Sequence, residues 1–209
     1  KQTLPEVASY GYDVLNQLTA DNDPTPEVLT YDTNSNGNRK TRAGQSYLYL
    51  ANSNRLTSVA GASVVYDNAG NIKTHPLTGQ TYTYTEAGQL NLMYQGSTLA
   101  AVYLYNPQGQ RTLKYDGQGT VLYHYDDAGH LLQETDNAGA LIRAYVWADD
   151  MPVVQITKTP TGEVLAYLHT DHLQTLRLAT NATGQVVWRW EGNAFGDNVP
   201  NEDPRATGI

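Results

Sequence analysis

Two stretches of the sequence, Tyr66-Asp67-Asn68-Ala69-Gly70-Asn71-Ile72 and Tyr125-Asp126-Asp127-Ala128-Gly129-His130-Leu131, are copies of one pattern. An aromatic residue is followed by Asp, a short polar stretch containing Gly, and an aliphatic residue. Tyr84–Leu90 and Tyr105–Arg111 keep the same plan. An Asp or Asn side chain can accept a hydrogen bond from the backbone two residues on, and Gly supplies the positive φ that closes a hairpin loop. Each copy therefore predicts a β-hairpin.

Aromatic or apolar pairs at positions i and i+2 recur along the chain, with a period of roughly 20 residues that is typical of repeat proteins. The pairs are Tyr10/Tyr12, Tyr47/Tyr49, Val64/Tyr66, Tyr82/Tyr84, Tyr103/Tyr105, Tyr123/Tyr125, Tyr145/Trp147, Tyr167/His169 and Trp188/Trp190. Side chains two apart on a strand share one face of a sheet. We therefore expect the rings of neighbouring hairpins to form a ladder across the sheet.

Turn sequences that contain glycine recur about every ten residues, a second and shorter period. This is the spacing expected of short strands in an all-β protein. One repeat is thus two strands joined by a Gly turn. The best amphipathic helix candidate, Asp13–Ala20, is short and lies inside a copy of the repeat. The residues that define the repeat are Tyr66, Asp67, Gly70, Tyr82, Tyr84, Gly88, Tyr103, Tyr105, Gly109, Tyr123, Tyr125, Asp126 and Gly129.

Charge and composition exclude several classes of function. The chain has 209 residues, a formal net charge of -8 and no cysteine. The acidic balance argues against nucleic-acid binding, which needs a positive surface. No apolar run approaches the ~18 residues of a membrane span. Because Lys1 opens the sequence without a start Met or a signal-peptide pattern, we expect the chain to be part of a longer protein.

The copies resemble the YD repeats of the RHS (rearrangement hot spot) and YD-repeat family, whose pattern runs roughly Tyr-Asp-x-x-Gly-Asn/Arg-Leu. The stretch from Tyr167 to Arg177 resembles the signature His-x-Asp-His-Leu-Gly-Thr-Pro-Arg, although Gln174 and Leu176 replace its Gly and Pro. The residues that match the signature region are His169, Asp171, His172, Leu173, Arg177, Trp188, Trp190, Phe195 and Gly196.

This resemblance implies an all-β fold in which tandem YD hairpins form a curved, coiled antiparallel sheet, part of a β-shell or cocoon. It implies a hairpin array over residues 1–165, a signature region continuing the sheet over 166–196, and a polar loop or tail over 197–209. No independent second domain is expected. The chain would be a structural segment from the C-terminal part of a repeat core that encloses a toxin domain. The family's self-cleavage motif is absent, and Asp203–Ile209 has the wrong spacing for it.

The same resemblance implies a secreted or cell-surface location within a larger bacterial protein that is cytoplasmic before export. Its expected partners are the rest of the polypeptide or another copy, through sheet edges, and an enclosed toxin domain. No cofactor, nucleic acid or catalytic residue is expected.

Two other hypotheses stay open. His169, Asp171 and His172 have metal-ligand chemistry, although a hydrogen-bonded turn explains them as well. An exposed stripe of aromatic rings could stack on sugars, with Trp147, Trp188 and Trp190 as candidates. The alternative function is therefore an extracellular binding module for glycan or protein partners.

Overall fold

The structure, a computed structural model, describes residues 9–22, 26–32 and 36–202. These residues form 21 strands and contain no helix, and every paired strand runs antiparallel to its neighbour. The helix candidate Asp13–Ala20 is instead a turn followed by the start of a strand. The all-β prediction is confirmed. No helix that could cross a membrane occurs in the part of the chain that the structure describes.

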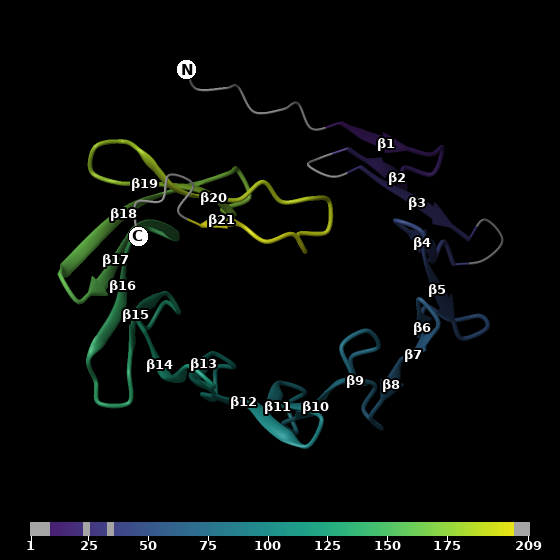
Figure 1. Cartoon of the computed structure of the whole chain (residues 1–209), viewed down its shortest axis with the longest axis horizontal. Helices are drawn as coiled ribbons and strands as arrows, with labels where there is room; N and C mark the ends of the chain where they lie inside the picture. Colours follow the sequence, from purple (N-terminus) through teal and green to yellow (C-terminus); the bar gives the residue numbers. More distant parts are fainter. Residues whose placement is uncertain (1–8, 23–25, 33–35, 203–209) are drawn as a thin grey trace. The chain divides into compact units, whose positions relative to one another are not determined.

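The first of two compact units, unit 1, comprises Lys1–Thr98 together with Gly192–Asn198. Its first seven strands form one sheet in chain order, and β8 to β11 follow in the same manner (Figure 1). Its strands are β1 (Tyr10–Tyr12), β2 (Leu18–Asp21), β3 (Glu27–Tyr31), β4 (Arg39–Arg42), β5 (Gln45–Tyr49), β6 (Leu56–Val59), β7 (Ala62–Ser63), β8 (Val65–Tyr66), β9 (Ile72–Thr74), β10 (Gln80–Tyr84) and β11 (Leu90–Gln95).

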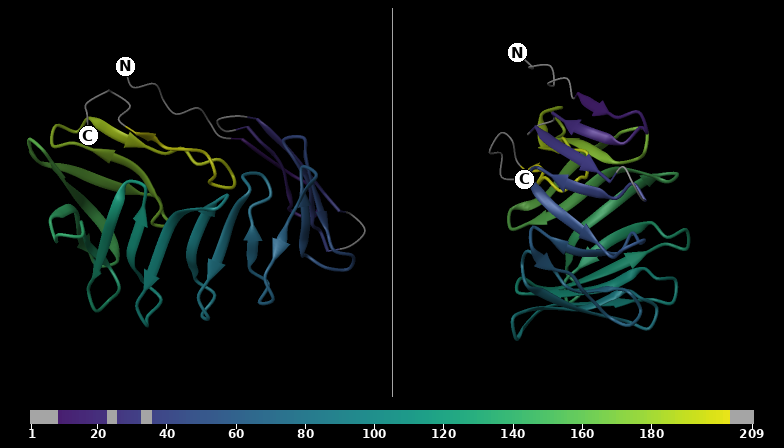
Figure 2. Two further views of the ribbon diagram at one scale, coloured as in Figure 1. Left: turned by 60° about the horizontal axis from the view of Figure 1, so that its bottom comes forward. Right: turned by 90° about the vertical axis from the view of Figure 1, so that its right-hand side faces the viewer.

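Unit 2 comprises Leu99–Glu191 and Val199–Ile209, and its strands also pair in chain order (Figure 2). They are β12 (Thr98–Tyr105), β13 (Arg111–Asp116), β14 (Gly119–Tyr125), β15 (Leu131–Thr135), β16 (Leu141–Ala148), β17 (Met151–Thr159), β18 (Gly162–Thr170), β19 (Leu176–Thr180), β20 (Val186–Arg189) and β21 (Asn201–Glu202).

Two kinds of turn connect the strands, and together they account for the ten-residue rhythm. In the longer kind the first side chain holds the loop. Asp67 Oδ1 accepts hydrogen bonds from the backbone N–H groups of Ala69 and Asn71 at 2.9 and 2.8 Å. A hydrogen bond from the Asn71 side chain, and then these backbone bonds, hold the pKa of Asp67 below its usual value. Gly70 closes the turn with φ of 92°, as predicted. The shorter kind is a tight two-residue turn, such as Ala43-Gly44, where both φ values are positive.

An irregularity in strand register accompanies several of the long turns, and in five of them it lies just before the second aromatic residue of the pair. Tyr84 faces Leu90, whereas the preceding Thr83 faces Leu92, so Asn91 is an extra residue on β11. The same shift recurs at Tyr49, Tyr66, Tyr105 and Tyr125. A β-bulge of this kind increases the local twist and interrupts the ladder of backbone hydrogen bonds.

The second aromatic residue of one hairpin donates a hydrogen bond to the preceding hairpin. In unit 1, Tyr84 Oη donates to the Ile72 carbonyl at 2.7 Å, and Ile72 is the cross-strand partner of Tyr66. The other members of the series are Tyr66 to Leu56, Tyr125 to Arg111 and, through Nε1, Trp147 to Leu131. We call this series of bonds the aromatic ladder. It links consecutive repeats through side chains as well as through strand pairing.

Few side chains are fully buried. In unit 2 the buried cluster is Ala166, Ala179 and Val187. Two segments differ from the expected boundaries. Residues 192–196, assigned from the sequence to the continuing sheet, form no strand and belong to unit 1. Within the expected loop or tail over 197–209, Asn201–Glu202 pair with β20 as β21. Residues 203–209, including the Asp203–Ile209 segment, lie outside the described part.

Candidate functional site

A densely connected polar site lies in unit 1, where Gly192–Asn198 contacts β2 and β4. We call these seven residues the latch segment. The chain leaves unit 1 at Thr98 and returns to it at Gly192. The latch segment contains Phe195 and Gly196, two of the residues that resemble the family signature.

Phe195 lies between two guanidinium groups. The Cζ atom of Arg39 is 4.6 Å from the centre of the Phe195 ring, and that of Arg42 is 4.5 Å away. Arg39 also lies over the ring of Tyr47, at 4.4 Å. Its Nε atom is buried and has no hydrogen-bond partner among the described residues. Arg39 is therefore held mainly by cation–π contacts with the rings of Tyr47 and Phe195, because a positive charge is attracted to the face of an aromatic ring.

Arg42 joins the latch segment to β3 by two bidentate ion pairs. Its Nη1 and Nη2 atoms donate to Asp197 at 2.5 and 2.8 Å, while Nε and Nη2 donate to Glu27 at 2.7 and 2.8 Å. The Arg42 and Glu27 side chains are only 13% and 15% exposed. The hydrogen bonds from Arg42, and then from Asn193, hold the pKa of Asp197 far below its usual range. Bidentate pairs of this kind fix orientation as well as charge.

Asp21 provides a further anchor. Its side chain is fully buried, and Oδ2 accepts a 2.7 Å hydrogen bond from the backbone N–H of Ala194. Within the latch segment, Asn193 accepts from the backbone N–H groups of Phe195 and Asp197, and Gly196 takes a positive φ of 67°. The segment is thus a structured turn that presents Phe195 and Asp197 to the strands. This geometry suits holding two parts of a chain together.

Four further signature residues, Asp171, Leu173, Arg177 and Trp190, form a second structural cluster, in unit 2. Asp171 accepts from the backbone N–H groups of Leu173 and Thr175, and its Oδ2 accepts from Arg177 Nε at 2.9 Å. Hydrogen bonding from Arg177, followed by the backbone bonds, lowers the pKa of Asp171. Arg177 in turn lies over the Trp190 ring at 5.0 Å. The signature therefore folds as a turn whose carboxylate holds the arginine.

The structure does not bring the metal candidates together. His169 Nε2 is paired with Thr180 Oγ1 at 2.9 Å, Asp171 is occupied by the turn, and His172 is exposed. Over residues 9–22, 26–32 and 36–202, no group of three His, Asp or Glu side chains has a geometry that could hold a metal ion.

The three tryptophans do not share one environment. Trp147 is stacked on His130, with ring centroids 4.6 Å apart, and belongs to the aromatic ladder. Trp190 lies under Arg177, and Trp188 lines a cavity in unit 2. Trp147 and Trp190, two of the three candidate sugar-stacking residues, are thus engaged in contacts within the protein.

Sequence reasoning identified Phe195 and Gly196 but missed Asp21, Arg39, Arg42 and Asp197. Their partners lie far away in the sequence: Arg42 and Asp197 are separated by 155 positions. Arg39 and Arg42 stand in an ordinary strand, and no local pattern distinguishes them from surface arginines.

A protein built from consecutive antiparallel hairpins, joined by an aromatic ladder and fastened by a structured segment, is a YD-repeat shell protein. The family model described as Teneurin YD-shell matches residues 4–207, so the chain belongs to the teneurin YD-shell family. Its role is structural, as a shell domain. A search of the curated proteins found no match.

Solved structures support the same fold. The structure of the Photorhabdus luminescens Tc holotoxin pore, with a mutated TccC3, aligns with a TM-score of 0.64 and 16% identity. A crystal structure of TcdB2, TccC3 and Cdc42 aligns with a TM-score of 0.60 and 16% identity. Each alignment covers 90% of this chain but only 12% of the other. At this identity the likeness concerns the fold alone.

Proposed function

We propose that this chain is a wall segment, from the C-terminal part of the repeat core, of an RHS-type shell that encloses a toxin domain of the same polypeptide. It acts by containment and carries no catalytic residue of its own. Its partners are the other repeats of the polypeptide or another copy, joined at sheet edges. It is exported as part of a larger bacterial protein and is cytoplasmic before export.

The observation that carries this proposal is the set of latch contacts. A wall that contains a cargo must not open at its weakest connection, and strand pairing alone leaves free edges. The latch segment adds one bidentate ion pair, between Arg42 and Asp197 across 155 positions of sequence, and a ring between two guanidinium groups. Removal of the Arg42 guanidinium leaves the largely buried Glu27 carboxylate without its cation, which is destabilising, whereas Asp197 is 53% exposed and loses less.

The test is protease protection in the full-length polypeptide. We expect the enclosed domain to resist digestion in the wild type and to become sensitive in Arg42→Ala and Phe195→Ala. Arg55→Ala is the matched control, because Arg55 lies over Tyr66 in the same unit and does not contact the latch segment. The control should stay protected.

Two results would count against the proposal. One is a wild-type polypeptide whose C-terminal domain is digested as fast as that domain alone. The other is equal sensitivity in the Arg55 control and the latch variants, which would indicate general loss of folding.

The alternative, a glycan-binding module, has one observation in its favour. A polar cavity of about 470 Å³ in unit 2 places the rings of Tyr123 and Tyr125 beside Asn106, Gln110 and Asp127. Aromatic rings beside amide and carboxylate groups can stack on a sugar and bond its hydroxyls. A reproducible hit on a glycan array, competed by free sugar and lost in Tyr123→Ala, would favour this function.

A further inference from the structure

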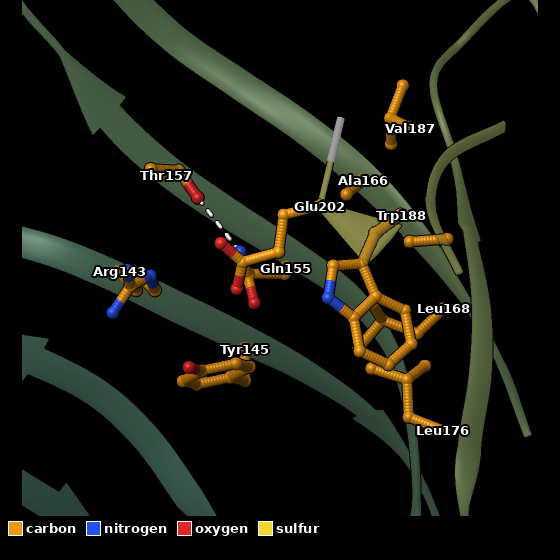
Figure 3. A pocket seen from close by; sticks show the side chains of 11 residues that line it. Arg143, Tyr145, Gln155, Thr157, Ala166, Leu168, Leu176, Val187, Trp188 and Glu202 are labelled. Atoms are coloured by element: carbon orange, nitrogen blue, oxygen red, sulfur yellow. Dashed lines mark hydrogen bonds between the residues drawn. The ribbon is translucent and has the colours of Figure 1, made fainter. Parts of the chain in front are cut away.

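A second cavity in unit 2, of about 310 Å³, opens on the sheet face that carries Tyr145 and Trp188 (Figure 3). Strand register explains its shape. Gln155 faces Ala166 across β17 and β18, and Ala179 faces Trp188 across β19 and β20. Ala166 and Ala179 are short, so the sheet is hollow between the larger side chains on either side. The size is at the lower end of the range of about 300–1,000 Å³ for ligand sites.

The floor of this cavity is apolar and the wall is aromatic. Ala166, Ala179 and Val187 are 5%, 3% and 2% exposed and form one buried cluster, with Leu168 and Trp188 packed against it. Val187 is the extra residue of a bulge between β19 and β20, since Ala179 faces Trp188 while Thr180 faces Val186. Trp188 is only partly buried and lines the cavity, so part of its indole ring is accessible to a ligand.

The charged groups at the mouth of the cavity are Arg143 and Glu202. Arg143 Nη1 already donates to Glu134 Oε2 at 3.0 Å, so its charge is countered. Glu202, the cross-strand partner of Trp188, is exposed and has no ion-pair partner among the described residues. In Figure 3 its carboxylate extends from the Trp188 side toward Gln155.

Gln155 adds to the same polarity. Its Nε2 donates to Thr157 Oγ1 at 3.0 Å, which leaves the amide oxygen as the group able to accept a further hydrogen bond. The mouth therefore offers a free carboxylate and a carbonyl oxygen above an apolar hollow. Both groups accept hydrogen bonds, and the carboxylate favours a donor that carries positive charge.

We propose that this cavity binds a basic side chain, an ammonium or guanidinium group on an aliphatic stem, presented by an extended peptide segment. The stem lies on Ala166, Ala179 and Val187. The cation lies over the Trp188 ring and pairs with Glu202, which combines a cation–π contact with an ion pair. The net charge of -8 also attracts basic segments. This inference does not depend on the proposed shell function.

The test uses the whole chain and four capped pentapeptides with glycine at every position except the centre. The central residue is lysine, arginine, norleucine or glutamate. Binding is followed through the indole N–H resonance of Trp188, assigned with Trp188→Phe. We expect saturable shifts with the lysine and arginine peptides and at least tenfold weaker binding of the norleucine peptide. The stronger of the two basic peptides identifies which cation the cavity prefers.

Two variants locate the site. Glu202→Gln should weaken binding of the basic peptides about tenfold, equivalent to about 1.4 kcal/mol, and leave the norleucine peptide unchanged. Ala179→Leu, which fills the hollow, should abolish binding of all four. The matched control is Glu163→Gln, an exposed carboxylate elsewhere in unit 2 that pairs with Lys158. Far-ultraviolet circular dichroism verifies that each variant is folded.

Three outcomes would overturn the proposal. The lysine and norleucine peptides could bind equally, which would make the cavity an apolar site. The glutamate peptide could bind most tightly, which would assign the site to Arg143 and an anion. No peptide could bind saturably at millimolar concentration, which would leave the hollow as a packing defect.

Discussion

Gln174 has a backbone conformation that glycine takes at the matching place in other turns. Its φ is 62°, and its N–H donates to the Asp171 carbonyl just as that of Gly129 donates to the Asp126 carbonyl. A side chain at positive φ costs about 1 kcal/mol. The turn forms nevertheless, because Asp171 accepts two backbone hydrogen bonds and one from Arg177.

The steric cost of positive φ at Gln174 can be tested by two opposite substitutions. We expect Gln174→Gly to raise the free energy of unfolding by about 1 kcal/mol, since glycine holds positive φ without steric cost. Gly184→Gln, in the next long turn, should lower it by a similar amount. Urea denaturation measures both values. A stability loss in Gln174→Gly would show that the glutamine side chain makes an unrecognised contribution.

At the scale of elements, the aromatic ladder connects one hairpin to the next. Tyr125 Oη donates to the Arg111 carbonyl at 2.9 Å, and partial burial raises the pKa of the Tyr125 hydroxyl. Arg111 itself lies between the rings of Tyr103 and Tyr123, at 5.5 and 5.0 Å. Hydroxyl, ring and guanidinium thus act together at this junction between hairpins.

Removing the hydroxyl alone isolates the contribution of the hydrogen bond. Tyr125→Phe should lower the free energy of unfolding by about 1 kcal/mol, because the ring still packs while the bond to Arg111 is lost. Tyr115→Phe is the control, since Tyr115 is 46% exposed and its hydroxyl has no partner among the described residues. Equal effects of the two substitutions in thermal unfolding would rule out a special role for the ladder bond.

His130 makes the junction between two hairpins of unit 2 sensitive to pH. Its Nδ1 and Nε2 atoms lie 3.0 and 2.9 Å from Asp126 and Asp150, and its ring stacks on Trp147. Hydrogen bonding to Asp150, and then to Asp126, raises the pKa of His130 above its ordinary value of 6.5. The protonated form is therefore favoured in the folded protein.

The raised pKa of His130 determines how the stability of the protein changes with pH. A raised pKa gives stability that is fully present below about pH 6.5 and is lost as pH rises through the folded value. As the pH rises through the pKa of His130 in the folded protein, we expect the free energy of unfolding to fall more in the wild type than in His130→Gln. Denaturation at a series of pH values above 6 measures the difference, and parallel curves for the two proteins would contradict the expectation.

The hairpins could be predicted from the sequence because their information is local. Asp67, Gly70 and Tyr66 lie within one turn, and each residue type has a distinct physical effect there. The latch contacts could not be predicted, because Asp21 and Arg42 are ordinary strand residues until the chain returns at Phe195. The cavity beside Trp188 was also missed, since it depends on the register that brings Ala179 opposite that ring.

At the scale of the whole molecule, the end strands of the sheets are open to association. Among the described residues β1 pairs only with β2, and Tyr10 and Tyr12 are 44% and 60% exposed. An exposed strand edge with apolar side chains is a template for pairing with another chain. Under the proposed function, further repeats or another copy would pair at this edge.

The isolated chain should therefore self-associate in a concentration-dependent manner. Light scattering after size-exclusion chromatography would detect it. Tyr12→Lys should reduce association, because a lysine on an edge strand opposes pairing. Leu48→Lys is the matched control, at a 59% exposed apolar residue on the interior strand β5. A stable monomer at all concentrations would contradict this expectation.

The latch contacts also bear on the order of events during synthesis. A ribosome makes Arg39 and Arg42 long before Phe195 and Asp197, so two guanidinium groups remain without these partners while the intervening hairpins emerge. The ladder bonds do not share this delay, because each donor meets an acceptor already made. Unit 1 thus becomes complete only after the middle of the chain has been translated, and a prematurely terminated product would lack the fastening altogether.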